Sequence, residues 1–258
     1  MDINEIINKA KLMNCLTEIP TACNHTCYLI SISETEHIIY IPNDVTVLNE
    51  EDSSKLNFTS KIRHLRGTIK VIGGEHLNDA QYMFYMCKAE LVDLSLFVTR
   101  NIIDMSRMFE QCRVKRIDLS KFNTCKVKYM CAMFADCWID RIDLSSFNTG
   151  IVKDMSYMFY ECRAKSIKLA SLDTKNVIDM TGMFEKCSTD SLDLSFSSLD
   201  SLRTAHCMFR NCVSRKIDLA SFNIDESVYC YNIFTGCTAK IKNANQFLIN
   251  LYNNRERQ

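Results

Sequence analysis

Residues 117–137 read IDLSKFNTCKVKYMCAMFADC, and residues 142–162 repeat the pattern as IDLSSFNTGIVKDMSYMFYEC. Both stretches end in Phe-x-x-Cys, a motif that recurs seven times at a spacing of 25 residues. The phenylalanines are Phe84, Phe109, Phe134, Phe159, Phe184, Phe209 and Phe234. The cysteines are Cys87, Cys112, Cys137, Cys162, Cys187, Cys212 and Cys237. A fixed period of this length indicates a stacked repeat, in which each unit buries its apolar face against its neighbours.

The residues before each motif form apolar columns. A Val or Ile lies seven residues before the Phe of the second to fifth units, and Met lies four residues and one residue before it, as in Val127, Met130 and Met133. These offsets place the side chains on one stripe of a short helix or of a run of helical turns. A threonine ten residues before the Phe is the predicted N-cap of that segment. The threonines are Thr99, Thr124, Thr149 and Thr174.

The residues after each cysteine change to a period of two, which is typical of a β-strand. The alternating triplets are residues 92–94, 117–119, 142–144, 167–169, 192–194 and 217–219. Because their offset is constant, strands of successive units should pair in parallel and in register. The predicted fold is an α/β solenoid, a leucine-rich-repeat-like stack of about seven strand–helical-turn units with a parallel sheet.

The expected organisation is one elongated solenoid with a cap at each end. The predicted parts are an N-terminal α+β capping unit (1–66), the repeat solenoid (67–240), and a C-terminal capping helix with a polar tail (241–258). Within the first part we expect an opening helix, a hairpin of strands over 27–33 and 37–41, and a strand-like segment over 45–48. Two units depart from the repeat: Phe196 is shifted, while Ala205 and Cys230 replace the first Met.

The stretches 117–137 and 142–162 resemble the 25-residue repeat of mycoplasma-type surface lipoproteins and related BspA-like leucine-rich repeat proteins. The resemblance covers about residues 77–240. It implies a leucine-rich-repeat-like solenoid used for binding, and it implies no catalytic residues.

Composition narrows the class of protein. The formal net charge is +0, so nothing in it favours binding to nucleic acid or to an anionic membrane. The chain has no apolar run of about 18 residues, and its first residues, Met-Asp-Ile-Asn, are unlike a signal peptide. We therefore expect a cytoplasmic protein. In that compartment its 14 cysteines should be thiols, with the seven-membered column serving as small core residues.

Three constellations could carry chemistry. Cys15, Cys23, His25 and Cys27 could be drawn as a zinc site, but their spacing fits no common zinc finger, and Cys15 is expected on the opening helix. His206 and Cys207 are adjacent in sequence, which is not expected to give the geometry of a catalytic dyad. Gly73-Gly74 lacks the rest of a phosphate-binding loop. We therefore predict no catalytic residue, no metal and no cofactor.

The outward face of the predicted sheet is the candidate partner-binding site. It carries a column of acidic residues interrupted by one lysine, and a basic column two residues earlier. These residues are Asp93, Arg116, Asp118, Arg141, Asp143, Lys168, Asp193, Lys216 and Asp218. The alternative interpretation is a solvated face, because exposed ion pairs contribute only ~0–1 kcal/mol each.

The first functional hypothesis is a non-enzymatic module that binds a protein partner through a rigid solenoid. If a phage or mobile element encodes the chain, an inhibitor of a host defence system would suit such a binder. The second hypothesis, which the resemblance suggests, is a surface or adhesin-type protein that binds host proteins. A metal- or thiol-dependent enzyme in the N-terminal unit is the third.

Overall fold

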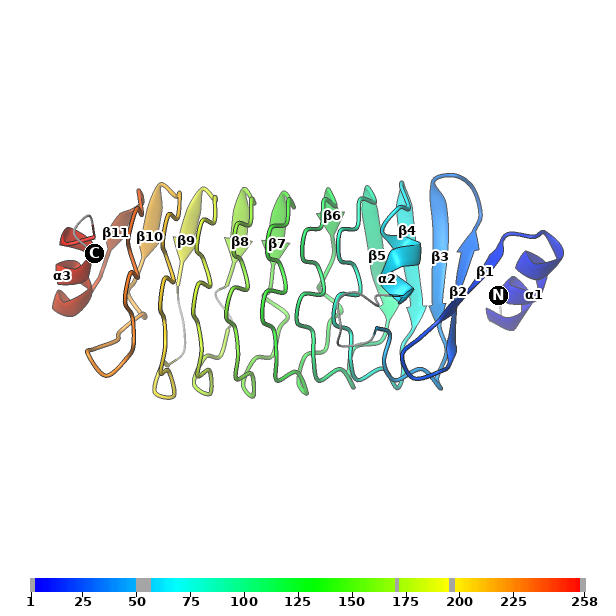
Figure 1. The fold of residues 1–258 in the computed structure, drawn as a ribbon, viewed down its shortest axis with the longest axis horizontal. Helices are drawn as coiled ribbons and strands as arrows, with labels where there is room; N and C mark the ends of the chain where they lie inside the picture. The colour runs from blue at the N-terminus through cyan, green and yellow to red at the C-terminus, as the bar shows by residue number, and fades with distance from the viewer. Residues whose placement is uncertain (1–2, 50–56, 170–171, 195–197, 256–258) are drawn as a thin grey trace.

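The computed structural model describes residues 3–49, 57–169, 172–194 and 198–255. Its rungs stack along one long axis to form a β-solenoid, with α1 and α3 at opposite ends (Figure 1). Neighbouring repeat strands pair in parallel. The predicted solenoid with a parallel sheet is therefore confirmed.

The N-terminal elements build a mixed sheet that continues into the repeats. They are α1 (Ile3–Leu12), β1 (Leu16–Pro20), β2 (Thr26–Ser31), β3 (Glu36–Ile41), α2 (Asn57–Ile62) and β4 (Thr68–Gly73). Strands β1, β2 and β3 pair antiparallel, whereas β3, β4 and the first repeat strand pair in parallel. The predicted hairpin is present as β2 and β3. Strand β1 and helix α2 were not predicted. The segment 45–48 is not a strand: Val47 makes one isolated bridge to Asp79, and Val45 and Leu48 are buried.

Each repeat contributes one short strand at the position of the alternating triplet. The strands are β5 (Leu91–Phe97), β6 (Arg116–Ile117), β7 (Arg141–Asp143), β8 (Ser166–Lys168), β9 (Ser191–Asp193), β10 (Lys216–Asp218) and β11 (Lys240–Lys242). The middle residue of β7 and of β8 points inward: Ile142 and Ile167 lie opposite each other in the sheet and are buried. The flanking residues, such as Arg141 and Asp143, are exposed.

The segment around each Phe-x-x-Cys motif is a run of turns and not a helix. Around Phe109, alternate N–H groups donate within the rung (Glu110 to Arg107, 3.1 Å) and to the next rung (Gln111 to Ala135, 2.8 Å). The residues two before and two after the Phe have left-handed backbone, with φ of 58° at Arg107 and 56° at Gln111. An α-helix would keep these hydrogen bonds inside the rung, so of the two predicted alternatives the short helix is wrong and a run of turns is present. The turns instead connect neighbouring rungs through backbone hydrogen bonds.

The threonine column performs the same bridging role. The Thr99 hydroxyl donates to the Asn123 carbonyl at 3.1 Å and accepts from the Asn123 N–H at 2.8 Å. Thr124 makes the same pair of bonds to Asn148. These threonines are almost fully buried. The predicted N-cap role is therefore wrong, because the hydroxyls satisfy backbone groups of the next rung.

Ladders of identical side chains fill the core. The seven phenylalanine rings stack with their neighbours at centroid separations between 5.3 Å and 5.8 Å. The cysteine column is buried and its thiols are free, and the Cys137 and Cys162 Sγ atoms lie 3.5 Å apart. That distance is far longer than the ~2.05 Å of a disulfide. The predicted column of reduced core thiols is confirmed in geometry.

The irregular units keep the inward pattern. Ala205 and Cys230 occupy the first methionine column and are buried, whereas the shifted Phe196 lies outside the described residues. Strand β11 is followed by α3 (Gln246–Asn253), which buries Leu248 and is capped by the Asn245 side chain.

Candidate interaction surfaces

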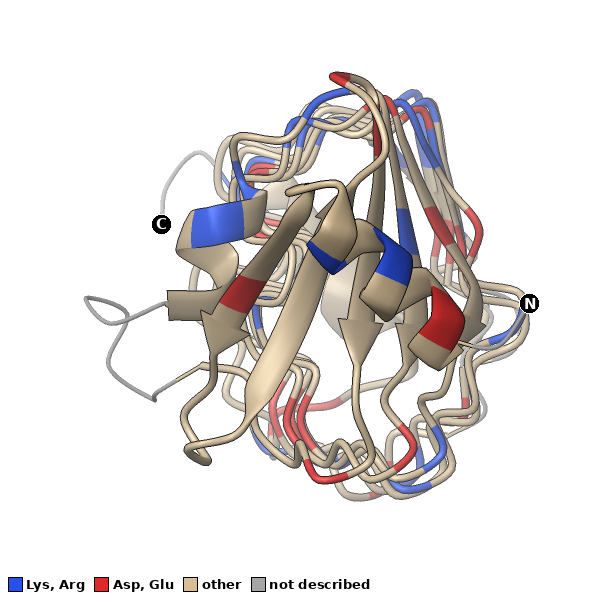
Figure 2. Cartoon of the chain, turned by 90° about the vertical axis from the view of Figure 1, so that its right-hand side faces the viewer, with Lys and Arg blue, Asp and Glu red and all other residues tan. Residues whose placement is uncertain are grey.

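Most charged side chains of the rungs lie on the outside of the solenoid. Figure 2 looks along the long axis and shows Lys, Arg, Asp and Glu around the periphery. Because residues 25 positions apart stack on one another, the outside is a set of columns. Three adjoining surfaces follow from these columns: the sheet face, the turn run, and the edge between them.

The predicted sheet-face residues lie outward, and five of them are in ion pairs. Lys168 contacts Asp143 at 2.8 Å, Lys70 contacts Asp93 at 3.8 Å, and Lys216 contacts Asp218 at 2.7 Å. The Asp118 carboxylate accepts from the Ser120 N–H at 2.9 Å. Asp193 lies at the same register position as Asp218. Arg116 and Arg141 make no ion pair with a described residue.

Asp143 is the most strongly perturbed member of this face. Hydrogen bonds from Lys168 and from Ser145 lower the pKa of its carboxyl group to about 2. Lys168 is the residue that interrupts the acidic column, and it forms its ion pair with Asp143 of the neighbouring rung. On the sheet face, five of the nine predicted residues are in ion pairs within the protein.

The turn run carries a surface that we call the tyrosine face. It consists of Tyr82, Tyr85, Tyr129, Tyr157, Tyr160, His206, Tyr229 and Tyr231. These rings contact one another: Tyr157 and Tyr160 pack edge to face at 5.8 Å, and His206 stacks on Tyr229 and Tyr231 at 5.4 Å and 5.8 Å. Tyr229 and Tyr231 are 61% and 55% exposed. This face was not predicted, although the tyrosines lie at outward offsets from the Phe column and are visible there in the sequence.

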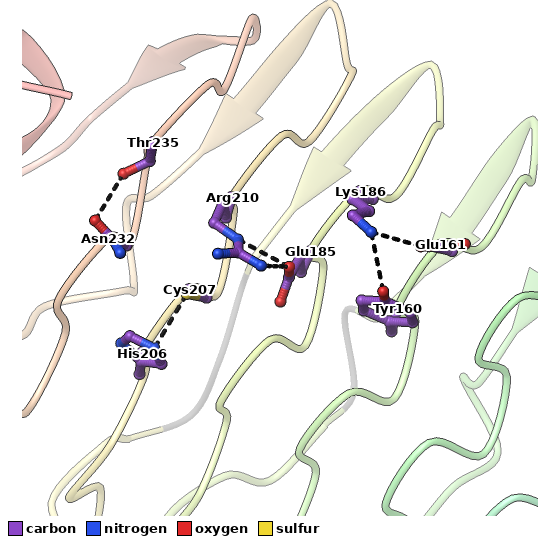
Figure 3. A network of polar contacts seen from close by, with 9 residues as sticks. All are labelled: Tyr160, Glu161, Glu185, Lys186, His206, Cys207, Arg210, Asn232 and Thr235. Atoms are coloured by element: carbon purple, nitrogen blue, oxygen red, sulfur yellow. Dashed lines mark hydrogen bonds and ion pairs between the residues drawn. The ribbon is translucent and has the colours of Figure 1, made fainter. Parts of the chain in front are cut away.

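Ion pairs support the tyrosine face from one rung to the next (Figure 3). Lys186 donates to Glu161 at 2.7 Å and to the Tyr160 hydroxyl at 3.0 Å. The Arg210 guanidinium binds Glu185, whose side chain is only 5% exposed. These contacts, between residues about 25 positions apart, fix the long side chains.

A depression of about 410 Å³ interrupts the tyrosine face where one rung carries alanine. Ala132 and Ala135 line it, with Tyr157 on one neighbouring rung and the Arg107–Glu110 ion pair on the other. Burial raises the pKa of the Glu110 carboxyl, and Arg107 opposes that shift. The depression could receive a side chain of a partner.

His206 and Cys207 are closer than the sequence predicts. The Cys207 Sγ lies 3.2 Å from the His206 Nε2, because Cys207 has left-handed backbone with φ of 56° (Figure 3). The two side chains therefore meet although they are adjacent in sequence, and the absence of a catalytic dyad here stays a prediction. Burial raises the pKa of the Cys207 thiol, however, so the contact does not stabilise a thiolate.

The N-terminal cysteines separate into different surroundings. Cys15 follows α1 and its Sγ approaches the Ala10 carbonyl at 3.5 Å, so it lies beyond the helix on which it was expected. Burial raises the pKa of Cys23, but hydrogen bonds from Thr21, the backbone of 46–47 and His25 outweigh it and lower the value to about 6. In the described part of the chain, no group of three or more His, Cys, Asp or Glu side chains is placed to hold a metal ion.

The edge between the two faces carries alternating charges that were not predicted from the sequence. Six residues after each Phe the column reads Glu90, Lys115, Asp140, Lys165, Asp190, Arg215 and Lys240. It forms three ion pairs between rungs: Lys115–Glu90 at 3.9 Å, Lys165–Asp140 at 3.2 Å and Arg215–Asp190 at 3.2 Å. The side chains stay 62% to 80% exposed, so the pairs are surface pairs.

No helix in the described ranges is long and apolar enough to cross a membrane. The stacked rungs and their exposed columns define the chain as a repeat solenoid protein.

The family model described as "Mycoplasma protein of unknown function, DUF285" matches residues 78–196 and 165–247. The chain belongs to this family. The match confirms the mycoplasma-type relationship inferred from the repeat and does not extend to BspA-like leucine-rich repeats. No curated protein and no solved structure matches the chain.

Proposed function

We propose that the chain is a non-enzymatic protein-interaction module that binds a protein partner along its tyrosine face. One observation carries the proposal. Within the described repeat rungs, the aromatic side chains exposed by more than a third belong to the turn run or to the edge beside it. They are Tyr129, Trp138, Tyr157, Tyr229 and Tyr231.

Tyrosine, tryptophan and arginine are the residues that most often dominate binding energy at protein interfaces. Here the rings already contact one another, as in the Tyr157–Tyr160 pair, and Lys186 holds the Tyr160 hydroxyl. Side chains that are fixed before binding lose less conformational entropy in a complex. The face is therefore suited to a protein partner.

The test compares partner capture by three forms of the chain from lysate of the native host, read by mass spectrometry. The first is the wild type, and the second carries Tyr157→Ala, Tyr229→Ala and Tyr231→Ala. The third carries Asp118→Lys and Asp143→Lys on the sheet face. We expect the tyrosine variant to lose the specific partner and the charge variant to retain it. Loss in the charge variant alone would move the interface to the sheet face predicted from sequence.

The second candidate, which the resemblance of the repeat to mycoplasma-type surface lipoproteins suggests, is a surface or adhesin-type protein that binds host proteins. An inhibitor of a host defence system is the intracellular form of the first candidate. Fractionation of the native cell, with an antibody against the chain, distinguishes them. Labelling on intact cells supports the adhesin, whereas recovery with a defence protein inside the cell supports the inhibitor.

A further inference from the structure

Three shallow depressions join end to end along the edge between the tyrosine face and the sheet face. Their volumes are about 460, 320 and 530 Å³. The first and second share Lys115 and Asp140, and the second and third share Asp140 and Arg163. They therefore form one groove, which runs parallel to the solenoid axis from Leu91 to Arg215. We call it the edge groove.

The edge groove is basic although the chain as a whole has a formal net charge of +0. Its basic side chains include Lys115, Lys165 and Arg215, which are 75%, 74% and 80% exposed. Arg113, Arg116, Arg141 and Arg163 also line it, against the acidic Asp118, Asp140 and Asp190. The lining thus carries a clear excess of positive charge.

Trp138 lies in the middle of the edge groove between two guanidinium groups. The Arg113 group lies 4.8 Å from its ring centroid and the Arg163 group 4.7 Å. Arg113 also binds the Asp136 carboxylate at 3.2 Å, which fixes its position. Cation–π contacts on both sides orient the two arginines, while the indole remains 49% exposed.

We propose that the edge groove binds an extended acidic peptide segment of a protein partner. The excess of basic side chains supplies charge complementarity, and the planar guanidinium groups suit carboxylates. Rungs are spaced by ~4.8 Å, so the six rungs from Leu91 to Arg215 span ~24 Å, about seven residues of extended peptide. This inference goes beyond the tyrosine face and does not depend on it.

A nucleic acid is the competing polyanion, and the geometry disfavours it. Proteins that bind single strands stack bases on exposed aromatic faces. Both faces of Trp138 are next to arginine groups, so the ring offers no open platform. Asp140 and Asp190 also interrupt the groove, which would repel a uniformly charged backbone but can be accommodated by a peptide of mixed sequence.

The test uses the full chain and a ten-residue peptide of alternating Glu and Gly, with a Gln–Gly peptide as the neutral probe. Trp138 is the only tryptophan of the chain, so its fluorescence reports occupancy of the groove directly. We expect saturable quenching or enhancement with the acidic peptide, weakened by salt, and no change with the neutral peptide.

Two variants decide whether the groove is the site. Lys115→Gln/Lys165→Gln/Arg215→Gln should weaken binding about tenfold or more, because three exposed charge contacts are lost. The control Lys128→Gln/Lys153→Gln/Arg203→Gln removes three exposed basic side chains of another column and should change affinity by less than about twofold. Equal losses in both variants, or no response to the acidic peptide, would overturn the proposal. Tighter binding of a ten-nucleotide poly-dT strand would overturn the choice of a peptide.

Discussion

At the scale of single residues, the repeat depends on side chains that meet their own copies. Phe159 stacks on Phe134 at 5.7 Å and on Phe184 at 5.3 Å, and all three are fully buried. A residue in this column supports two interfaces at once, because each rung contacts only its neighbours. Surface columns contribute little by comparison, since their charges are exposed.

Phe159→Ala should lower the free energy of unfolding by ~3–5 kcal/mol, through lost burial and the cavity left behind. Urea denaturation followed by circular dichroism measures the change. The exposed Tyr129→Ala is the matched control and should stay within ~0.5 kcal/mol. Similar losses in both variants would contradict the stacked column.

The stability that the Asp143–Lys168 ion pair contributes should depend on pH. Its pKa is about 2 in the folded protein, below the ordinary value of 3.8, because Lys168 and Ser145 donate hydrogen bonds to it. A carboxyl group whose pKa is lower in the folded than in the unfolded protein stabilises the fold at pH values above its unfolded pKa. This stabilisation is lost as the pH falls from about 4 toward 2.

Lys168→Met should raise the Asp143 pKa toward its ordinary value, as measured by carboxyl carbon NMR titration. Asp118 serves as the internal reference, since the Ser120 N–H and hydroxyl are the main groups that lower its pKa. An unchanged Asp143 pKa in the variant would show that Ser145 alone sets it.

At the scale of elements, each rung combines one short strand with a run of turns, and both bond to the neighbouring rung. Strand β7 pairs with β8 in register, and the Phe134 N–H in the turn run donates to the Met158 carbonyl at 2.9 Å. The left-handed residues in the turns cost free energy compared with a helix. The hydrogen bonds between rungs offset that cost.

The thiol columns should react according to burial. Ten of the fourteen cysteines are buried, three are intermediate and Cys125 is exposed. Burial raises the pKa of Cys212 well above its ordinary range, which slows its reaction further. Denatured protein should therefore titrate as fourteen thiols with a bulky disulfide reagent, whereas native protein should show a fast phase of one to four.

Cys125→Ser should remove one thiol from the fast phase and leave the slow phase unchanged. Disulfides between successive ladder cysteines, detected by mass spectrometry without reduction, would contradict the free thiols of the column.

At the scale of the whole molecule, the solenoid is nearly one-dimensional, so the apolar surface of its two end rungs has to be capped. Helix α3 buries Leu248 against the core, and the Tyr252 hydroxyl donates to the Ala239 carbonyl at 2.7 Å. At the other end, α1 packs Ile7 and Ala10 beside Ile30 of β2. In such an array, a substitution that weakens one end should destabilise the adjacent rung first, because each rung contacts only its neighbours.

Leu248→Ala should increase amide hydrogen exchange first in the rung of Phe234 and leave the rung of Phe109 protected, as local openings begin at the weakened end. Exchange followed by mass spectrometry resolves the rungs. Gln246→Ala on the same helix is the control and should change neither rung. Uniform loss of protection would indicate that the chain unfolds as a single cooperative unit.

The sequence alone determined the repeat, the solenoid and the inward columns, because a period of 25 residues is visible without any structure. The 3-3-1-3 spacing from Val127 to Cys137 could not separate a helix from a run of turns, since both put these side chains on one stripe. That choice is made by hydrogen bonds to the next rung, such as Gln111 to Ala135.

The surfaces were decided only by the tertiary structure. The sheet-face charges were visible as a column, but their pairing, as in Lys168–Asp143, required the rungs to be stacked. The tyrosine face and the edge groove join residues 25 or more positions apart, including Arg113, Trp138 and Arg163. Local patterns report which side chains point outward, whereas only the stacking of rungs brings them together into a surface.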